Sequence, residues 1–203
     1  MNTFHQLDFD EGAYGVNNAS IAARLIPTLV CPSDDYTPDS GILRSSYAGC
    51  TGGKNVPIDT DNTGLLFLNS SVMFKQIKDG SSNTILLGER RFDDYLVQDL
   101  GWLSGTGATL RNSAVPINRV RFLGGGFGGG FGQFGGGPGN NADEAETPDF
   151  PQDQMTGGFS SQHTGGCTIL LADGSVRYIS ENTPASVLKH LGDRDDGAMM
   201  PEF

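Results

Sequence analysis

The sequence contains no long apolar run. A membrane-spanning helix needs roughly 20 consecutive apolar residues, and no such stretch occurs in the chain. Residues 1–15, MNTFHQLDFDEGAYG, also lack the basic start and the apolar centre of a secretory signal peptide. We therefore expect a soluble domain with no membrane span in this chain.

Positive charge is scarce as well. The chain has 13 Lys and Arg against 24 Asp and Glu, which gives a net charge of -11. Binding to nucleic acid needs clustered Lys and Arg to neutralise phosphates, and here these residues are scattered. The composition excludes nucleic acid as an expected partner, whereas an acidic surface suits solubility and divalent cations.

Histidine and cysteine are rare, with three of each. There is no CxxC pair and no Cys/His cluster along the sequence, so we expect no structural zinc site. His5, His163 and His190 lie in no metal-protease or triad motif. Ser160 and Ser161 stand near His163 without an oxyanion motif or an orienting acid. We therefore predict that the protein is not an enzyme and that hydrogen bonds of His163 pin its loop.

The chain does contain a hairpin pattern at residues 167–180. Residues 167–172 form an apolar, β-branched-rich run, and Asp173-Gly174 is a two-residue turn that accepts positive φ. Residues 175–180 alternate between two faces, and Ile179 is expected to point outward. The pattern predicts two antiparallel strands joined by a type I′ turn.

Four motifs follow one another along the chain. Nine residues separate His163 from Asp173-Gly174, and Gly165-Gly166 lets the backbone bend into the first strand. The other three are Cys31-Pro32-Ser33-Asp34, then Asp79-Gly80-Ser81-Ser82-Asn83-Thr84 with the following Gly88-Glu89-Arg90, and Leu191-Gly192-Asp193-Arg194-Asp195-Asp196-Gly197. With these motifs the chain resembles the large planctomycete family of pilin-like proteins. That family is named for its prepilin-type processing-associated H-x9-DG motif and is also classed as a solute-binding domain of unknown function.

The resemblance implies an exported protein, extracellular or in the cell envelope, built on the type IV pilin plan. That plan includes a cleavage-methylation signal and a long apolar helix, which this sequence does not show. We therefore expect the processed or trimmed soluble part of such a protein rather than a divergent member. The expected function is a non-enzymatic structural subunit of a pilus-like, pseudopilin-type or other surface assembly, with self-association or other envelope proteins as partners. The alternative is an exported solute- or calcium-binding module.

In an exported protein, two of the three cysteines would be expected to pair. Cys31 and Cys50 flank a short, turn-rich segment, and closing this loop would stabilise the fold by about 3 kcal/mol in the chain-entropy model. Cys167 opens an apolar strand, where a small buried thiol is expected. A Cys31–Cys50 disulfide and three reduced, buried thiols both remain open.

The motif around Asp79 is expected to be structural. The side chains of Asp79, Ser82 and Asn83 suit a turn that satisfies its own backbone N–H groups. Glu89 ends the apolar run that follows, and a buried carboxylate without a partner is costly. We expect a salt bridge there, not a catalytic acid; the candidate partners are Arg90, Arg91 and Arg177.

No cofactor is required by the sequence, and calcium is the candidate it offers. Asp59, Asp61 and Asn62 supply oxygen ligands within a polar loop. The loop lacks the glycine and the distant glutamate of an EF-hand, and Asp residues in loops also solvate turns. A calcium site and a plain turn both fit this pattern.

Residues 123–141 are rich in glycine, with Phe127, Phe131 and Phe134 set between the glycines. Ordering such a segment costs much backbone entropy, which favours a flexible insertion loop. The second interpretation is an assembly loop, whose phenylalanines order against a neighbouring subunit.

Together these patterns predict an α+β fold, a single pilin-like globular domain over residues 1–203. Its sheet is expected to be mainly antiparallel, with long loops and short helices near residues 18–26 and 184–190. The second helix would bury three apolar side chains, Val187, Leu188 and Leu191.

Overall fold

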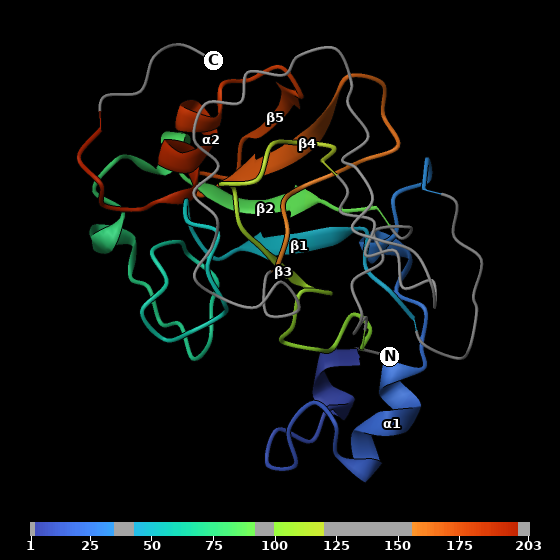
Figure 1. Ribbon diagram of the computed structural model, residues 1–203. Coiled ribbons are helices and arrows are strands. Elements are labelled where there is room, and N and C mark those ends of the chain that lie inside the picture. Colours follow the sequence, from blue (N-terminus) through green and yellow to red (C-terminus); the bar gives the residue numbers. More distant parts are fainter. Residues whose placement is uncertain (1–2, 35–42, 92–99, 120–155, 199–203) are drawn as a thin grey trace, which may run out of the picture.

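A five-stranded sheet runs through the computed structural model, which describes residues 3–34, 43–91, 100–119 and 156–198 (Figure 1). The strands are β1 (Tyr47–Cys50), β2 (Ile85–Glu89), β3 (Leu110–Arg111), β4 (Gly166–Leu171) and β5 (Val176–Ser180). Their spatial order is β3-β1-β2-β4-β5. β1 and β3 are parallel, whereas the other neighbouring pairs are antiparallel. The predicted α+β fold with a mainly antiparallel sheet is therefore confirmed.

β4 and β5 form the predicted hairpin, but its turn differs from the prediction. A type I′ turn needs positive φ at two successive residues, and of the Asp173-Gly174 pair only Gly174 has it, at 86°. The Gly174 N–H donates to Leu171 O at 3.0 Å, and the Leu171 N–H donates to Ser175 O at 2.9 Å. These bonds define a three-residue loop that ends in a left-handed residue.

The inner face of the hairpin also corrects one expectation. Ile179 is buried, whereas Val176 and Tyr178 are exposed, so the outward orientation predicted for Ile179 is wrong. Opposite residues of an antiparallel pair share a face of the sheet. Ile179 lies opposite the buried Cys167 in the register of β4 and β5, and it therefore faces the core.

Helix α2 (Ala185–Gly192) covers this core. Val187, Leu188 and Leu191 are buried, as predicted. A helix of this length is not stable alone in water, so the burial of these side chains, at about 1.5–3 kcal/mol each, holds α2 in place. The cluster that they join contains Cys50, Ile85, Ile117, Phe159, Cys167, Ile169, Leu171 and Ile179.

Helix α1 (Val16–Ala22) lies away from the sheet, at the bottom of Figure 1. It is shifted toward the N-terminus relative to the predicted helix near residues 18–26, and Gly15 precedes it. Asn18 is buried instead. Its side-chain N–H groups donate to Asp8 O and Gly12 O, both at 2.7 Å, and its side-chain oxygen accepts the Asp8 N–H at 2.8 Å. Asn18 thereby ties the preceding loop to the helix.

Short 3-10 helices connect these elements. The helix Pro27–Leu29 leads toward Cys31, and the helix Ser81–Asn83 leads into β2; the others are Thr3–Gln6 and Phe74–Gln76. Within the described ranges, no helix combines the length and the apolar character needed to cross a membrane.

Candidate functional site

Three strand ends meet at one edge of the sheet. β2 is antiparallel to β1 and to β4, so its C-terminal end lies beside the start of both neighbours. Glu89 is the last residue of β2, and its register partner is Tyr47, the first residue of β1. The loop before β4 carries His163 to the same edge.

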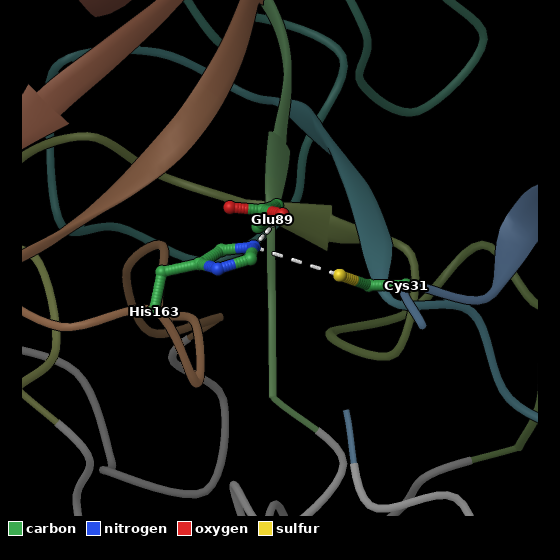
Figure 2. Close-up of side chains that lie close together, drawn as sticks. All are labelled: Cys31, Glu89 and His163. Carbon is green, nitrogen blue, oxygen red and sulfur yellow. Dashed lines mark hydrogen bonds and ion pairs between the residues drawn. The ribbon is translucent and has the colours of Figure 1, made fainter. Parts of the chain in front are cut away.

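Cys31, Glu89 and His163 converge at this edge (Figure 2). The His163 Nε2 atom lies 3.2 Å from Glu89 Oε1 and 3.6 Å from Cys31 Sγ. One donor atom from each residue lies within 4.8 Å of the other two. Across the described part of the chain, this is the one group of three His, Cys, Asp or Glu residues whose donor atoms lie so close together.

The motif nearest the N-terminus positions the Cys31 thiol. Cys31-Pro32-Ser33-Asp34 forms a turn, in which the Asp34 N–H donates to Cys31 O at 3.0 Å. The Cys31 N–H donates to Ser46 Oγ at 2.9 Å, and the Ser46 hydroxyl donates to Asp34 Oδ2 at 3.1 Å. This small network fixes the Cys31 backbone against the residue that precedes β1.

Glu89 is 4% exposed, and its two carboxylate oxygens have different partners. Oε1 faces His163, and Oε2 accepts the Thr168 N–H of β4 at 2.6 Å. The salt bridge with arginine that the sequence favoured is therefore replaced by an imidazole and a backbone amide. Successive side chains of a strand point to opposite faces, and Arg90 donates to Ala108 O at 2.6 Å instead.

His163 is held by its own loop. Its backbone N–H donates to Ser161 Oγ at 3.0 Å, and the Ser161 hydroxyl donates to Gly166 O at 2.7 Å. Gly165 and Gly166 then lead into β4, and a Cβ on Gly166 would lie 2.1 Å from Ile179 O. The glycine at position 166 is thus required by the close approach of β5.

Tyr47 lies beside the three residues, where its phenol is harder to ionise. Burial raises the pKa of the Tyr47 phenol, and the adjacent Cys31 and Glu89 groups raise it further. The edge therefore favours a positive group over an additional negative one.

This geometry differs from that of a catalytic triad. In a triad the acid binds the ring nitrogen that faces away from the nucleophile. Here Glu89 Oε1 and Cys31 Sγ both face Nε2 of His163, so the acid does not orient the imidazole toward the thiol. The three groups instead point at a common centre, which is an arrangement suited to holding a positive ligand.

The cysteines do not pair. Cys31, Cys50 and Cys167 are free thiols, so of the two alternatives that the sequence left open the structure shows the reduced cysteines, of which Cys31 is only half-buried. Cys31 lies near the start of β1, whereas Cys50 is the last residue of this strand. Because a strand rises by about 3.3 Å per residue, the length of β1 keeps the two cysteines apart. Burial raises the pKa of the Cys50 and Cys167 thiols to about 12.

The motif around Asp79 forms a turn, but its side chains do not bind the turn's own N–H groups as expected: Asn83 and Thr84 donate to backbone carbonyls, and the Asp79 carboxylate binds residues 196 and 197. The Asn83 amide donates to Asp79 O, and the Thr84 hydroxyl donates to Gly80 O, both at 3.1 Å. Ser82 lies in the 3-10 helix Ser81–Asn83 of the same turn. These residues therefore serve the entry into β2 and do not reach the Cys31–Glu89–His163 cluster.

The motifs also bind one another. The Asp79 carboxylate accepts the N–H groups of Asp196 and Gly197 at 2.6 and 3.0 Å. The Asp173 N–H donates to Ser81 O at 3.0 Å. The motif around Asp79 thus joins residues 191–197 to the Asp173-Gly174 turn of the hairpin.

The loop proposed for calcium lines a groove of about 260 Å³ that includes Asp59, Asp61 and Asn62. Asn62 Oδ1 accepts the Asp59 N–H at 2.9 Å, and Asp59 Oδ1 accepts the Thr60 N–H at 2.6 Å. Two of the three side chains therefore take part in the turn itself. The proposed subunit contacts lie outside the described residues; they are Phe127, Phe131 and Phe134.

The structure is an α+β domain built around a mixed sheet, and Cys31, Glu89 and His163 meet at one edge of that sheet. The four motifs form the turns and loops that connect its elements. The chain belongs to the family described as a protein of unknown function (DUF1559), whose model matches residues 1–186. This match confirms the family resemblance that the motifs indicated. No curated protein and no solved structure matches the chain.

Proposed function

We propose that this chain is the head of a non-enzymatic, exported subunit of a pilus-like or other surface assembly. The observation that supports this most is a set of exposed apolar side chains on the N-terminal segment. Exposed apolar patches of this kind mark interaction sites on soluble domains. The set, called the N-terminal patch below, consists of Phe4, Phe9, Tyr14, Val16 and Leu25.

The N-terminal patch lies on and around α1, which stands apart from the sheet (Figure 1). Phe4 and Phe9 are 61% and 65% exposed, with ring centres 5.1 Å apart. Tyr14, another member of the patch, lines a groove of about 280 Å³ between α1 and residues 100–103. We infer that another copy of the chain covers this surface, because every subunit of an assembly presents the same faces to its neighbours.

The non-enzymatic part of the proposal is supported by the sheet edge. Cys31 and Glu89 approach the same nitrogen of His163, so the acid lies on the thiol's side of the ring and not at the far nitrogen, where it orients the base of a triad. An exported location is supported by the family resemblance. Protease treatment of intact cells, followed by detection of the chain, tests that location: protection from the protease would contradict it.

Sedimentation velocity over a concentration series tests the assembly role. We expect the parent to self-associate and the Phe4→Ser/Phe9→Ser double variant to do so at least about tenfold more weakly, because a buried Phe contributes about 1.5–3 kcal/mol. Phe74→Ser is the matched control, since Phe74 is 69% exposed and lies in another 3-10 helix. Equal association of parent and double variant, or a parent that stays monomeric, contradicts the proposal.

A second candidate function is an exported solute- or calcium-binding module, which the groove beside Asp59 and Asp61 favours. Calcium titration by calorimetry separates the two candidates. Binding that Asp61→Asn weakens, without any change in self-association, supports this second function. A chain that takes up no calcium at millimolar concentration contradicts it.

A further inference from the structure

The Cys31–Glu89–His163 cluster has the spacing of a metal site. Tetrahedral zinc has bonds of about 2.3 Å to sulfur and about 2.0–2.2 Å to nitrogen and oxygen. These bonds place the sulfur and nitrogen ligands about 3.5 Å apart, and the nitrogen and oxygen ligands about 3.4 Å apart. The corresponding distances here are 3.6 Å from Cys31 Sγ to His163 Nε2 and 3.2 Å from His163 Nε2 to Glu89 Oε1.

Hydrogen bonding alone satisfies this cluster poorly. A neutral imidazole nitrogen presents either one hydrogen or one lone pair, yet both Cys31 and Glu89 point at the same Nε2 atom (Figure 2). A cation at the common centre would accept the nitrogen lone pair, the thiolate and the carboxylate at once. It would also offset the negative charge of the bound thiolate and carboxylate, because the thiol gives up its proton when it binds a metal.

The supporting contacts resemble those that orient metal ligands. Outer hydrogen bonds fix the geometry of ligands in metal sites. Here the second carboxylate oxygen of Glu89, Oε2, accepts the Thr168 N–H. The backbone N–H groups of Cys31 and His163 donate to serine hydroxyls. The ligands are therefore pre-positioned by β4 and by two short loops, at no cost in rearrangement of the sheet.

We propose that Cys31, Glu89 and His163 bind one divalent transition metal ion, with Zn²⁺ as the preferred ion. A set of one sulfur, one nitrogen and one oxygen ligand suits Zn²⁺ and its first-row neighbours. Ca²⁺ and Mg²⁺ take oxygen ligands and are excluded by the thiolate and the imidazole. The side chain of His163 is 36% exposed, so the fourth position is open to water.

Metal titration of the full chain under a phosphine reductant tests the proposal. We expect Zn²⁺ to bind with 1:1 stoichiometry by calorimetry, and Co²⁺ to give a thiolate-to-cobalt charge-transfer band. Cys31→Ser, Glu89→Gln and His163→Ala should each weaken Zn²⁺ binding by at least about tenfold, the lower end of the losses seen even for outer-contact changes. His190→Ala is the matched control, since His190 pairs with Asp196 in another part of the fold, and it should bind Zn²⁺ like the parent.

A second measurement needs no variant and so does not depend on variant folding. Zn²⁺ should slow the alkylation of Cys31 in the parent, as followed by mass spectrometry, while Mg²⁺ at the same concentration should not. An unchanged alkylation rate at saturating Zn²⁺ overturns the proposal. Cobalt binding without a charge-transfer band, or zinc binding that His163→Ala leaves intact, overturns it too.

Discussion

The three cysteines occupy two kinds of environment. Cys50 and Cys167 are 0% exposed, and burial raises the pKa of each thiol to about 12, whereas Cys31 is half-buried. Because the thiolate is the reactive form, we expect iodoacetamide at pH 8 to modify Cys31 in the metal-free folded protein. Cys50 and Cys167 should react only after denaturation. Mass spectrometry of the alkylated peptides measures this, and uniform labelling of the native chain would contradict it.

The same two buried thiols link stability to pH. Their pKa in the folded protein is about 12, against about 8.5 for an unperturbed cysteine. Between these values the unfolded chain binds fewer protons than the folded one, so the free energy of unfolding falls as pH rises. Their contribution is complete below about pH 8.5 and is lost progressively toward pH 12.

Urea denaturation at pH 8 and pH 10.5 measures this fall. Cys167→Ala should show a smaller decrease between the two pH values than the parent, because one of the two buried thiols is gone. A free energy of unfolding that stays constant or rises over this range would contradict the effect.

Gly174 is the residue on which the hairpin turn depends. Its φ of 86° is strained for any residue with a Cβ, so we expect Gly174→Val to lower the free energy of unfolding by about 1–3 kcal/mol. Gly105→Val is the matched control, because a Cβ there meets no atom within 4 Å and its φ is not positive. Thermal melting of both variants checks this, and equal melting temperatures for Gly174→Val and the parent would show a turn of another type.

At the scale of elements, α1 depends on one buried amide. Asn18→Ala removes three hydrogen bonds to Asp8 and Gly12 and should lower the free energy of unfolding by about 1–3 kcal/mol. Asn17 is exposed and bonds the exposed Glu11, so Asn17→Ala should cost less than about 0.5 kcal/mol. Urea denaturation of the pair measures the difference. Equal effects would mean that Asn18 does not anchor the loop.

Elements with strong local signals could be predicted from the sequence. The hairpin, α2 and its three buried side chains follow from an apolar run, an Asp-Gly pair and a helical spacing. The form of the turn could not be predicted, since Asp-Gly fits both a two-residue turn and the end of a three-residue loop. The side of the sheet on which the Ile179 side chain lies could not be predicted either. It depends on which face of β4 meets the core, and the alternation of residues within one strand does not contain that information.

The candidate site was missed for a different reason. Cys31 and His163 are 132 positions apart, and their proximity depends on the order of the strands. One signal was present: Glu89 ends one strand, and His163 shortly precedes another. Antiparallel pairing of those two strands would place both residues at one edge, but the pairing itself is not visible in the sequence.

At the scale of the whole molecule, the assembly-loop interpretation of the glycine-rich segment, residues 123–141, predicts that this segment acts between copies of the chain. Ordering about 19 residues would cost on the order of 20 kcal/mol, and burying three phenylalanines at about 2–3 kcal/mol each does not offset this cost. If the segment becomes ordered, a neighbouring copy must therefore supply the remaining stabilisation. Deletion of residues 124–137 should therefore change the melting temperature by less than about 2 °C, which corresponds to under about 1 kcal/mol for a chain of this size.

The same deletion should weaken self-association, as measured by sedimentation or by electron microscopy of filaments. Phe74→Ser again serves as the variant that changes an exposed apolar residue elsewhere. A deletion that unfolds the chain, or one that leaves association intact, would assign the segment to the domain itself or to no contact.

The residues of the Cys31–Glu89–His163 cluster lie far apart in the sequence, and this separation sets the order of events when the chain folds. The β4–β5 hairpin closes locally, whereas Glu89 and Thr168 are 79 positions apart and Cys31 and His163 are 132 apart. Distant contacts pay their loop-closure entropy before they gain any stabilisation, so the hairpin can form early while the edge must wait for the complete sheet. A nascent chain would therefore present the Cys31 thiol without the imidazole, and pulsed alkylation of the buried Cys50 and Cys167 during refolding would date the moment at which the sheet closes.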